Sequence, residues 1–263
     1  MLTITTAELN TWIASLLWPL TRILGLIVTA PVFGNLSIPA RVKVMFGIMV
    51  TLIIAPTVPA LPATDPMSLP GFLILLQQFV IGLAMGFAMR IAFSAVEMAG
   101  EAIGLTMGFG FATFFDPQTR ARSSAISQFL SLLTLLLFVV TNAHLMLLSV
   151  LAESFSTLPI SALPFGGQGF RQLANWGAVI FATGLQLALP VLAVLLLTNI
   201  ALGVLTRTAP QLNLFGIGFP ITVGAGFIMI LLALPFLATP LNRLFMEGLD
   251  VIRQIAAATA LPR

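Results

Sequence analysis

The feature that most restricts the fold is a set of long apolar stretches without a charged residue. Three of them, residues 123–152, 172–206 and 208–242, exceed the ~20 residues that a helix needs to cross a bilayer. A backbone in lipid has to be helical or part of a closed barrel, and no alternating strand pattern occurs. We therefore expect an all-α, membrane-associated protein whose six apolar, proline-kinked helices cover roughly 12–34, 44–63, 70–96, 123–150, 174–205 and 213–238.

The composition excludes several classes of protein. Charged residues make up 7% of the chain, against about 25% in a soluble domain, so the chain lies in lipid or is buried by partners. The basic residues form no cluster, which argues against a nucleic-acid partner. With no cysteine and His144 as the one histidine, no metal site and no cofactor are expected. No catalytic motif occurs, so an enzyme is not expected.

Charged residues between the blocks predict a topology. Arg41 and Lys43 follow the first block, Arg120 and Arg122 the third, and Arg207 the fifth. By the positive-inside rule these loops are cytoplasmic and both termini lie outside, although three arginines in the C-terminal tail argue against this. Prolines that remove helical hydrogen bonds lie in or beside the blocks, as is typical of transporters and channels; they are Pro19, Pro31, Pro56, Pro190, Pro220 and Pro235.

The stretch from 104 to 122 is rich in glycine and phenylalanine and lies between apolar blocks. Glycine gives the backbone freedom, and an Asp-Pro pair stops a helix. We expect a non-helical loop near membrane depth, which is tolerated only inside protein or along a cavity. Two interpretations stay open, a plug in a conduit and an interfacial loop anchored in headgroups. The candidate plug residues are Met107, Gly108, Phe109, Gly110, Phe111, Phe114, Phe115, Asp116 and Pro117.

The segment before this loop carries a glycine stripe and three charges. Gly82, Gly86, Gly100 and Gly104 are spaced by four residues within each pair, which favours close helix packing. Arg90, Glu97 and Glu101 are expected to be buried beside them, because ionisable groups at this depth usually face a bundle interior. The simpler interpretation is that Arg90 pairs with Glu97, two turns away, or with a partner subunit. The alternative is a proton relay through Glu97 and Glu101. His144 is expected to form a hydrogen bond between helices, with proton handling as the alternative.

Three long motifs resemble the FliR family of flagellar export-gate proteins and its counterparts in virulence secretion systems. They read RILGLIVTAPVFGNLSIPARVKV, MGFGFATFFDPQTRARSSAISQFLSLLTLLLFVVTNAH and ALPVLAVLLLTNIALGVLTRTAPQLNLFGIGFPITVGAG. They occur in the family's order and cover almost the entire chain. Ala143 departs from the pattern, because the family usually has glycine there, and we expect a local effect on packing.

The resemblance implies a gate subunit of the flagellar basal body in the bacterial inner membrane, raised toward the periplasm. It implies FliP-type and FliQ-type partners in a helical assembly, with residues 1–160 similar to FliP and 170–263 to a FliQ hairpin and tail. Unfolded flagellar proteins would pass through the gate, and an FlhB-type subunit would lie at its entrance. A cytoplasmic turn is expected to contact that subunit through Arg207, Pro210, Gln211 and Asn213.

Two other classes remain as alternatives. A secondary transporter or channel for small solutes is expected to show an internal repeat with matched broken helices. Blocks one to three and four to six share no motif. A purely structural scaffold without a pore is the second alternative.

Overall fold

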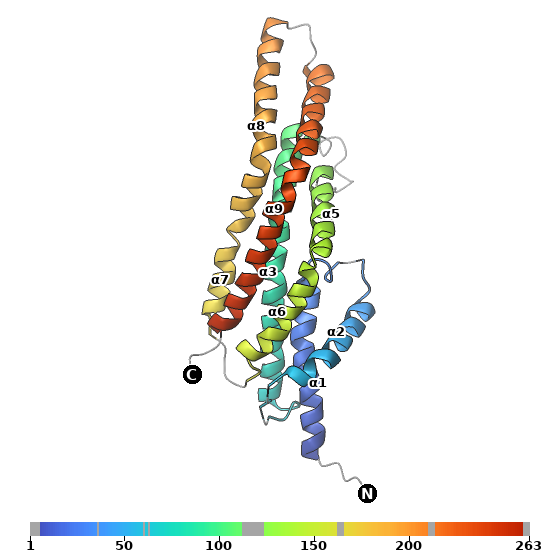
Figure 1. The fold of residues 1–263 in the computed structure, drawn as a ribbon, viewed down its shortest axis with the longest axis vertical. Coiled ribbons are helices and arrows are strands. Elements are labelled where there is room, and N and C mark those ends of the chain that lie inside the picture. The colour runs from blue at the N-terminus through green and yellow to red at the C-terminus, as the bar shows by residue number, and fades with distance from the viewer. Residues whose placement is uncertain are drawn as a thin grey trace. The chain divides into compact units, whose positions relative to one another are not determined.

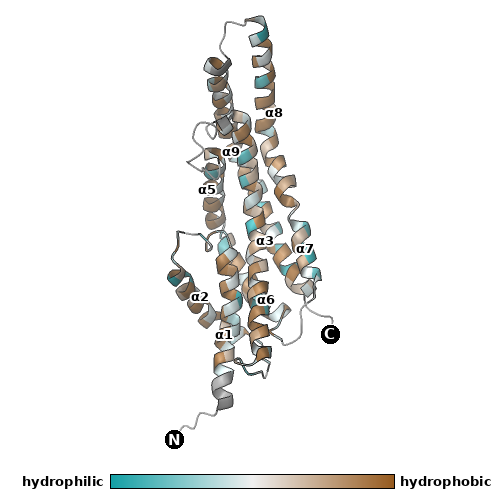
Figure 2. Cartoon of the chain, turned by 180° about the vertical axis from the view of Figure 1, so that it is seen from behind, coloured by the Kyte–Doolittle hydropathy of each residue, from teal (hydrophilic) through white to brown (hydrophobic). Residues whose placement is uncertain are grey.

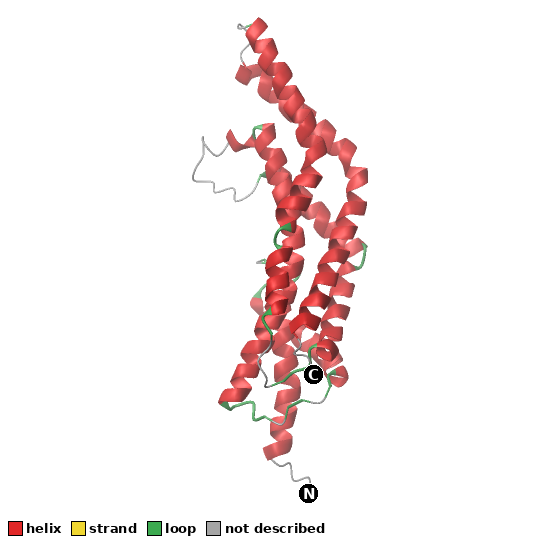
Figure 3. Cartoon of the chain, turned by 90° about the vertical axis from the view of Figure 1, so that its left-hand side faces the viewer, coloured by secondary structure: helices red, strands yellow, loops and turns green. Residues whose placement is uncertain are grey.

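A computed structural model of the chain describes residues 6–35, 37–59, 61–62, 64–111, 124–161, 166–209 and 214–259. Within these ranges the chain forms helices and no strand (Figure 3). The helices, labelled in Figure 1, are α1 (Thr6–Thr29), α2 (Ala40–Ile54), η1 (Ala55–Thr57), α3 (Leu69–Met107), η2 (Phe109–Phe111), α5 (Ala125–Val140), α6 (Ala143–Thr157), α7 (Gln168–Trp176), α8 (Val179–Thr208), the π-helical turn η3 (Leu214–Gly218) and α9 (Phe219–Thr259).

The expected all-α membrane architecture is confirmed. Five of the described helical stretches are long and apolar enough to cross a membrane, and the count rises to six if the bent pair α5 and α6 forms one span. Only 22% of the best window in α7–α8 and 17% of that in α9 is buried within the chain. Figure 2 shows hydrophobic residues along most of α8. These faces therefore need lipid or protein to cover them.

The fourth apolar block was expected to be one helix, but it breaks after α5. Thr141 ends α5, and Asn142 adopts a left-handed backbone with φ 58° before α6 begins. Asparagine tolerates this conformation better than most residues and commonly follows a helix end. Ala143, the departure from the family pattern, is fully buried at this break.

Two helices are longer than the apolar blocks suggested. α3 continues through Met107, so residues 104–107 are helical and the expected loop begins only at Gly108. α9 continues through Pro235 and Pro240 to Thr259 and includes most of the expected tail. A helix can continue through charged residues once tertiary packing supports it, and hydropathy alone does not report that packing.

The chain divides into two compact units that interleave along the sequence. Unit 1 contains residues 1–91, 142–177 and 245–263, and unit 2 contains 92–141 and 178–244. α3 and α9 each continue from one unit into the other. The expected FliP-like part (1–160) and FliQ-like part (170–263) describe likeness to other gate subunits. Their boundary does not match the boundaries of these two units, and the division stays a prediction.

Unit 1 is held together by α1, α6, α7 and the adjoining parts of α3 and α9. The indole Nε1 of Trp176 donates to the carbonyl of Ala88 at 2.9 Å, which ties α7 to α3. Gly169 of α7 lies against the backbone of Ile255, where an added Cβ would be 2.8 Å from the carbonyl oxygen. An exposed ion pair of 3.4 Å joins Arg253 to Glu153.

Unit 2 packs α5, α8 and part of α9 on the second half of α3. The rings of Phe93 and Phe138 meet edge to face at 5.4 Å, which joins α3 to α5. Gly184 of α8 lies so close to α3 that a Cβ would stand 2.7 Å from the carbonyl oxygen of Ala95. The expected plug loop leaves from this unit and returns to it.

Candidate functional site

The loop after α3 starts from a firmly packed residue. Met107 is fully buried, and its thioether fills the space beside Gly226 of α9, where an added Cβ would lie 2.6 Å from the sulfur. The hydroxyl of Thr222 donates to the carbonyl of Met107 at 3.4 Å. Met107, expected to be part of the plug, is therefore the fixed point from which the loop departs.

The first loop residues turn sharply away from the helix axis. Gly108 has φ 96°, a backbone conformation that residues with a Cβ rarely adopt. Phe109 follows, and its ring meets that of Phe227 edge to face at 6.4 Å. Gly110 and Phe111 complete the short helix η2. The other candidate plug residues, Phe114, Phe115, Asp116 and Pro117, lie outside the described residues.

The loop returns at Ser124, which is tied back to α3. Glu101 accepts a hydrogen bond of 2.6 Å from the backbone N–H of Ser124. The Ser124 hydroxyl caps α5 by accepting from the N–H of Ser127 at 3.1 Å, and it donates to the carbonyl of Gly100 at 3.3 Å. A carboxylate at a helix N-terminus is also favoured by the helix dipole. We call Glu101 and Ser124 the return clamp.

The glycines of the expected packing stripe lie against two different helices. A Cβ at Gly82 would collide with the backbone of Arg22, and one at Gly86 would collide with the hydroxyl of Thr29, both on α1. Gly100 and Gly104 instead face α5, where a Cβ at Gly104 would be 2.6 Å from Ser124 Oγ. The stripe therefore packs within this chain.

The three expected buried charges do not share one environment. Arg90 is exposed, so the chain by itself does not bury it; it lies three residues after the exposed Phe87, on the same outward helix face. Its pairing with a partner subunit stays a prediction. Glu97 and Glu101 are half-buried. Glu101 is part of the return clamp, and its hydrogen bond with Ser124 explains its position without a proton relay.

Sequence reasoning missed a residue at the centre of unit 1. Arg22 is fully buried, and its guanidinium donates to the side-chain oxygen of Gln78 at 2.8 Å and to the carbonyl of Leu158 at 2.9 Å. It also donates to the carbonyl and hydroxyl of Ser154 at 3.0 and 3.1 Å and lies 4.3 Å from the centre of the Phe155 ring. The last carbonyls of α6 carry partial negative charge, so they balance this cation. An arginine in the middle of an apolar block was the available signal.

Two further expectations concern His144 and the turn after α8. His144 Nδ1 is buried without a hydrogen-bond partner in the described part of the chain, so the expected interhelical bond is absent for that atom. Arg207 is exposed in the last turn of α8. Pro210, Gln211 and Asn213 lie outside the described residues. Among the residues that are described, no group of three or more His, Asp or Glu side chains could hold a metal ion.

Comparisons with known proteins agree over nearly the full chain. Residues 13–248 match the family model for bacterial export proteins, family 1. The chain is 45% identical over 255 residues to the flagellar biosynthetic protein FliR of Pectobacterium carotovorum, covering 97% of each chain. It is 42% identical over 263 residues to that of Escherichia coli (99% and 100% covered) and 31% identical over 239 residues to that of Bacillus subtilis (90% and 92%). The chain belongs to the FliR family of bacterial export proteins.

Proposed function

We propose that this chain is a subunit of the flagellar protein export gate, and that the loop after α3 seals the conduit. The export family and the flagellar relatives support a role in export and argue against the alternative of a small-solute transporter. The observation that carries the sealing role is the pair of anchors at the ends of the loop. They fix where the loop begins and where it ends.

Both anchors belong to one stretch of α3. Glu101 accepts the hydrogen bond from Ser124, where the chain returns from the loop. The loop starts after Met107, six residues further along α3, which is about 9 Å along a helix. The sixteen residues 108–123 span at most about 55 Å when fully extended. A closed loop of this length therefore reaches at most about 25 Å from its base.

The side chains of the loop suit a seal. Phenylalanines exclude water and ions without placing a charge in the conduit, and a hydrophobic constriction blocks conduction by dewetting. Gly108 and Gly110 let the backbone rearrange when an unfolded protein arrives. The base of the loop stays in place because Met107 is packed against Gly226.

The finer assembly is the one that the resemblance to the family implies, and it is part of this proposal. FliP-type and FliQ-type subunits cover the exposed apolar faces of α8 and α9, and the gate is raised toward the periplasm in the inner membrane of the basal body. The turn after Arg207 faces the cytoplasm, where an FlhB-type subunit contacts Gln211 and Asn213. Unfolded flagellar proteins pass through the conduit.

The sealing role is tested by replacing Phe109, Phe111, Phe114 and Phe115 with alanine. The matched control replaces two exposed phenylalanines outside the loop, Phe181 on α8 and Phe236 on α9. Cells that carry each variant are assayed for leakage of small solutes, and the gate is purified to establish that it assembles. We expect leakage only with the loop variant. An assembled gate that stays tight without these four rings would contradict the proposal.

A further inference from the structure

Two buried hydrogen-bond donors lie beside Arg22 in unit 1. The side chains of Trp18 and Gln78 are fully buried. Among the residues that the structure describes, neither the indole Nε1 of Trp18 nor the amide Nε2 of Gln78 has a hydrogen-bond partner. Buried polar atoms in proteins nearly always have a partner, in the protein or in an ordered water, because an unpaired one is costly. These two donors therefore need an acceptor.

Arg22 fixes the orientation of the Gln78 amide. A guanidinium group has donors and no acceptor, so the amide oxygen has to face it, and Oε1 accepts from Nε of Arg22 at 2.8 Å. The two ends of the amide cannot change places without breaking this bond. The unpaired atom of Gln78 is therefore a donor, as is the indole nitrogen of Trp18.

The packing of α1 against α3 shows how the two helices are aligned. An added Cβ at Gly82 would collide with the carbonyl of Arg22, and one at Gly86 would lie 2.7 Å from the carbonyl of Leu26. The two helices therefore run parallel, and a step of four residues along α3 matches a step of four residues along α1.

The same alignment brings the two donors to one level of the helix pair. Gln78 lies four residues before Gly82, and Trp18 lies four residues before Arg22. Such a step is about one helical turn, or roughly 6 Å. The hydrogen bond between Arg22 and Gln78 shows that the helices are still close at this level. One small acceptor between α1 and α3 can therefore serve both donors.

The chemistry of the cluster selects a neutral acceptor. All three nitrogen atoms of the guanidinium already donate, to Gln78, Ser154 and Leu158. The donors that remain are two neutral N–H groups, which suit the oxygen of a water better than a desolvated anion. The hydroxyl of Ser154 accepts from Arg22 at 3.1 Å and has a second lone pair for a hydrogen of the water. Two to four such bonds are usual for a buried water.

We propose that unit 1 binds one ordered water molecule between α1 and α3, which accepts from Trp18 Nε1 and Gln78 Nε2. The water completes the hydrogen bonds around the buried guanidinium of Arg22, so it is part of the arrangement that holds this cation in place. The site uses no residue of the loop after α3 and is independent of the proposed sealing role.

The three tryptophans allow a matched test. Benzothienylalanine has the shape of tryptophan with sulfur in place of the indole N–H, so it removes the donor and keeps the packing. Trp18→benzothienylalanine should lower the midpoint of thermal unfolding of the assembled full-length protein by about 1–6 °C, because a hydrogen bond is lost. The same replacement at Trp176, whose Nε1 donates to the carbonyl of Ala88, should also lower the midpoint. At the exposed Trp12 it should change nothing.

The sign of the Trp18 effect is decisive. If its N–H had no acceptor, removing this unpaired buried donor would raise the midpoint, and such a rise would overturn the proposal. Exchange of chloride for gluconate should leave the midpoint of the unsubstituted protein unchanged. A shift that the Trp18 variant lacks would assign the site to an anion and overturn the proposal as well.

A density map of the unsubstituted, assembled protein, at a resolution that shows ordered water, tests the site without any variant. We expect a peak at about 2.7–3.2 Å from both Trp18 Nε1 and Gln78 Nε2. A map without this peak, or with an oxygen of the protein in its place, would overturn the proposal.

Discussion

Replacing Arg22 with methionine should destabilise unit 1, and the structure sets the size of the effect. Methionine fills similar space but leaves two buried acceptors without their partner, Gln78 Oε1 and the carbonyl of Leu158. Both oxygens of Ser154 keep a hydrogen bond in the variant. The carbonyl still accepts from the N–H of Leu158 at 2.9 Å, and the hydroxyl still donates to the carbonyl of Leu151 at 2.6 Å.

Each buried group left unpaired costs about 1–3 kcal/mol, so the two together cost about 2–6 kcal/mol. Methionine offsets part of this cost, because the wild-type protein has to bury a charge and the variant does not. We expect Arg22→Met to lower the free energy of unfolding by about 2–4 kcal/mol. At ~2–4 °C per kcal/mol for a chain of this size, the midpoint of thermal unfolding falls by roughly 4–16 °C.

The assay is thermal unfolding of the purified gate in mild detergent, and two comparisons make it specific. Arg253→Met removes an exposed arginine with carboxylate partners and should cost less than about 1 kcal/mol. Combining Arg22→Met with Gln78→Leu removes one orphaned acceptor, so the double variant should be more stable than the sum of the single effects predicts. Two results would refute the reasoning: an equal loss of unfolding free energy in Arg22→Met and Arg253→Met, or a double variant whose loss equals the sum of those of Arg22→Met and Gln78→Leu.

Three other predictions follow from the site. Gly104→Leu should sharply reduce recovery of the assembled gate, because its Cβ would collide with α5, whereas Gly203→Leu, with nothing within 4 Å, should be recovered normally. Glu101→Ala and Ser124→Ala should each speed hydrogen exchange at the first amides of α5, and loss of the serine cap should lower helix stability by about 0.5–2 kcal/mol. Unchanged exchange in both variants would show that the return clamp does not hold this end of α5. A cysteine at Gln211 should be labelled from the cytoplasmic side and crosslink to the FlhB-type subunit, and labelling only from the periplasm would reverse the proposed orientation.

The sequence predicted those features that depend on local spacing. The helical class followed from the length of the uncharged stretches. The four-residue spacing of Gly82 and Gly86 was the local signal at the place where α3 lies close to α1. The break at Asn142 was missed because hydropathy stays high across it, and the available signal was an asparagine inside an apolar run, a residue that can take the left-handed position at a helix end.

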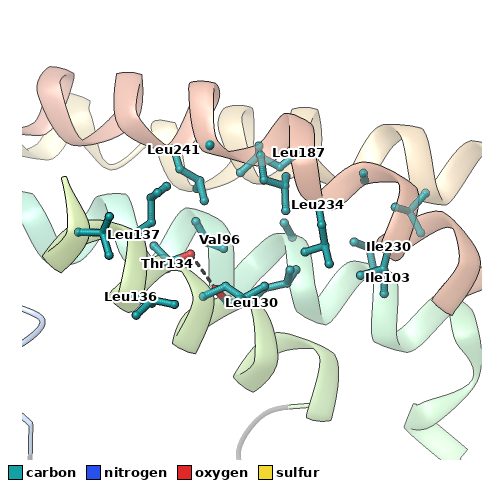
Figure 4. A pocket seen from close by; sticks show the side chains of 17 residues that line it. Val96, Ile103, Leu130, Thr134, Leu136, Leu137, Leu187, Ile230, Leu234 and Leu241 are labelled. Atoms are coloured by element: carbon teal, nitrogen blue, oxygen red, sulfur yellow. Dashed lines mark hydrogen bonds between the residues drawn. The ribbon is translucent and has the colours of Figure 1, made fainter.

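Long-range partners could not be read from the sequence. The carbonyl acceptors of Arg22 lie 132 and 136 residues away along the chain. The carboxylate of Glu101 meets a backbone N–H 23 residues later. From the sequence Glu101 was a candidate for a proton relay with Glu97, because sequence patterns reveal charged side chains but not free backbone groups at helix ends. The same limit applies to the apolar pocket of unit 2 (Figure 4), whose lining residues come from the four helices α3, α5, α8 and α9.

The most direct test of the central claim asks whether an exported protein passes the loop. A photo-crosslinking amino acid is placed at Phe109, or at the exposed Phe181 of α8 as a control, in cells whose export is stalled by a flagellar subunit with a folded domain that cannot pass. The account predicts a crosslink between position 109 and the stalled subunit, and none from position 181. A gate that exports normally but gives no crosslink from position 109 during the stall would contradict the claim that this loop closes the conduit.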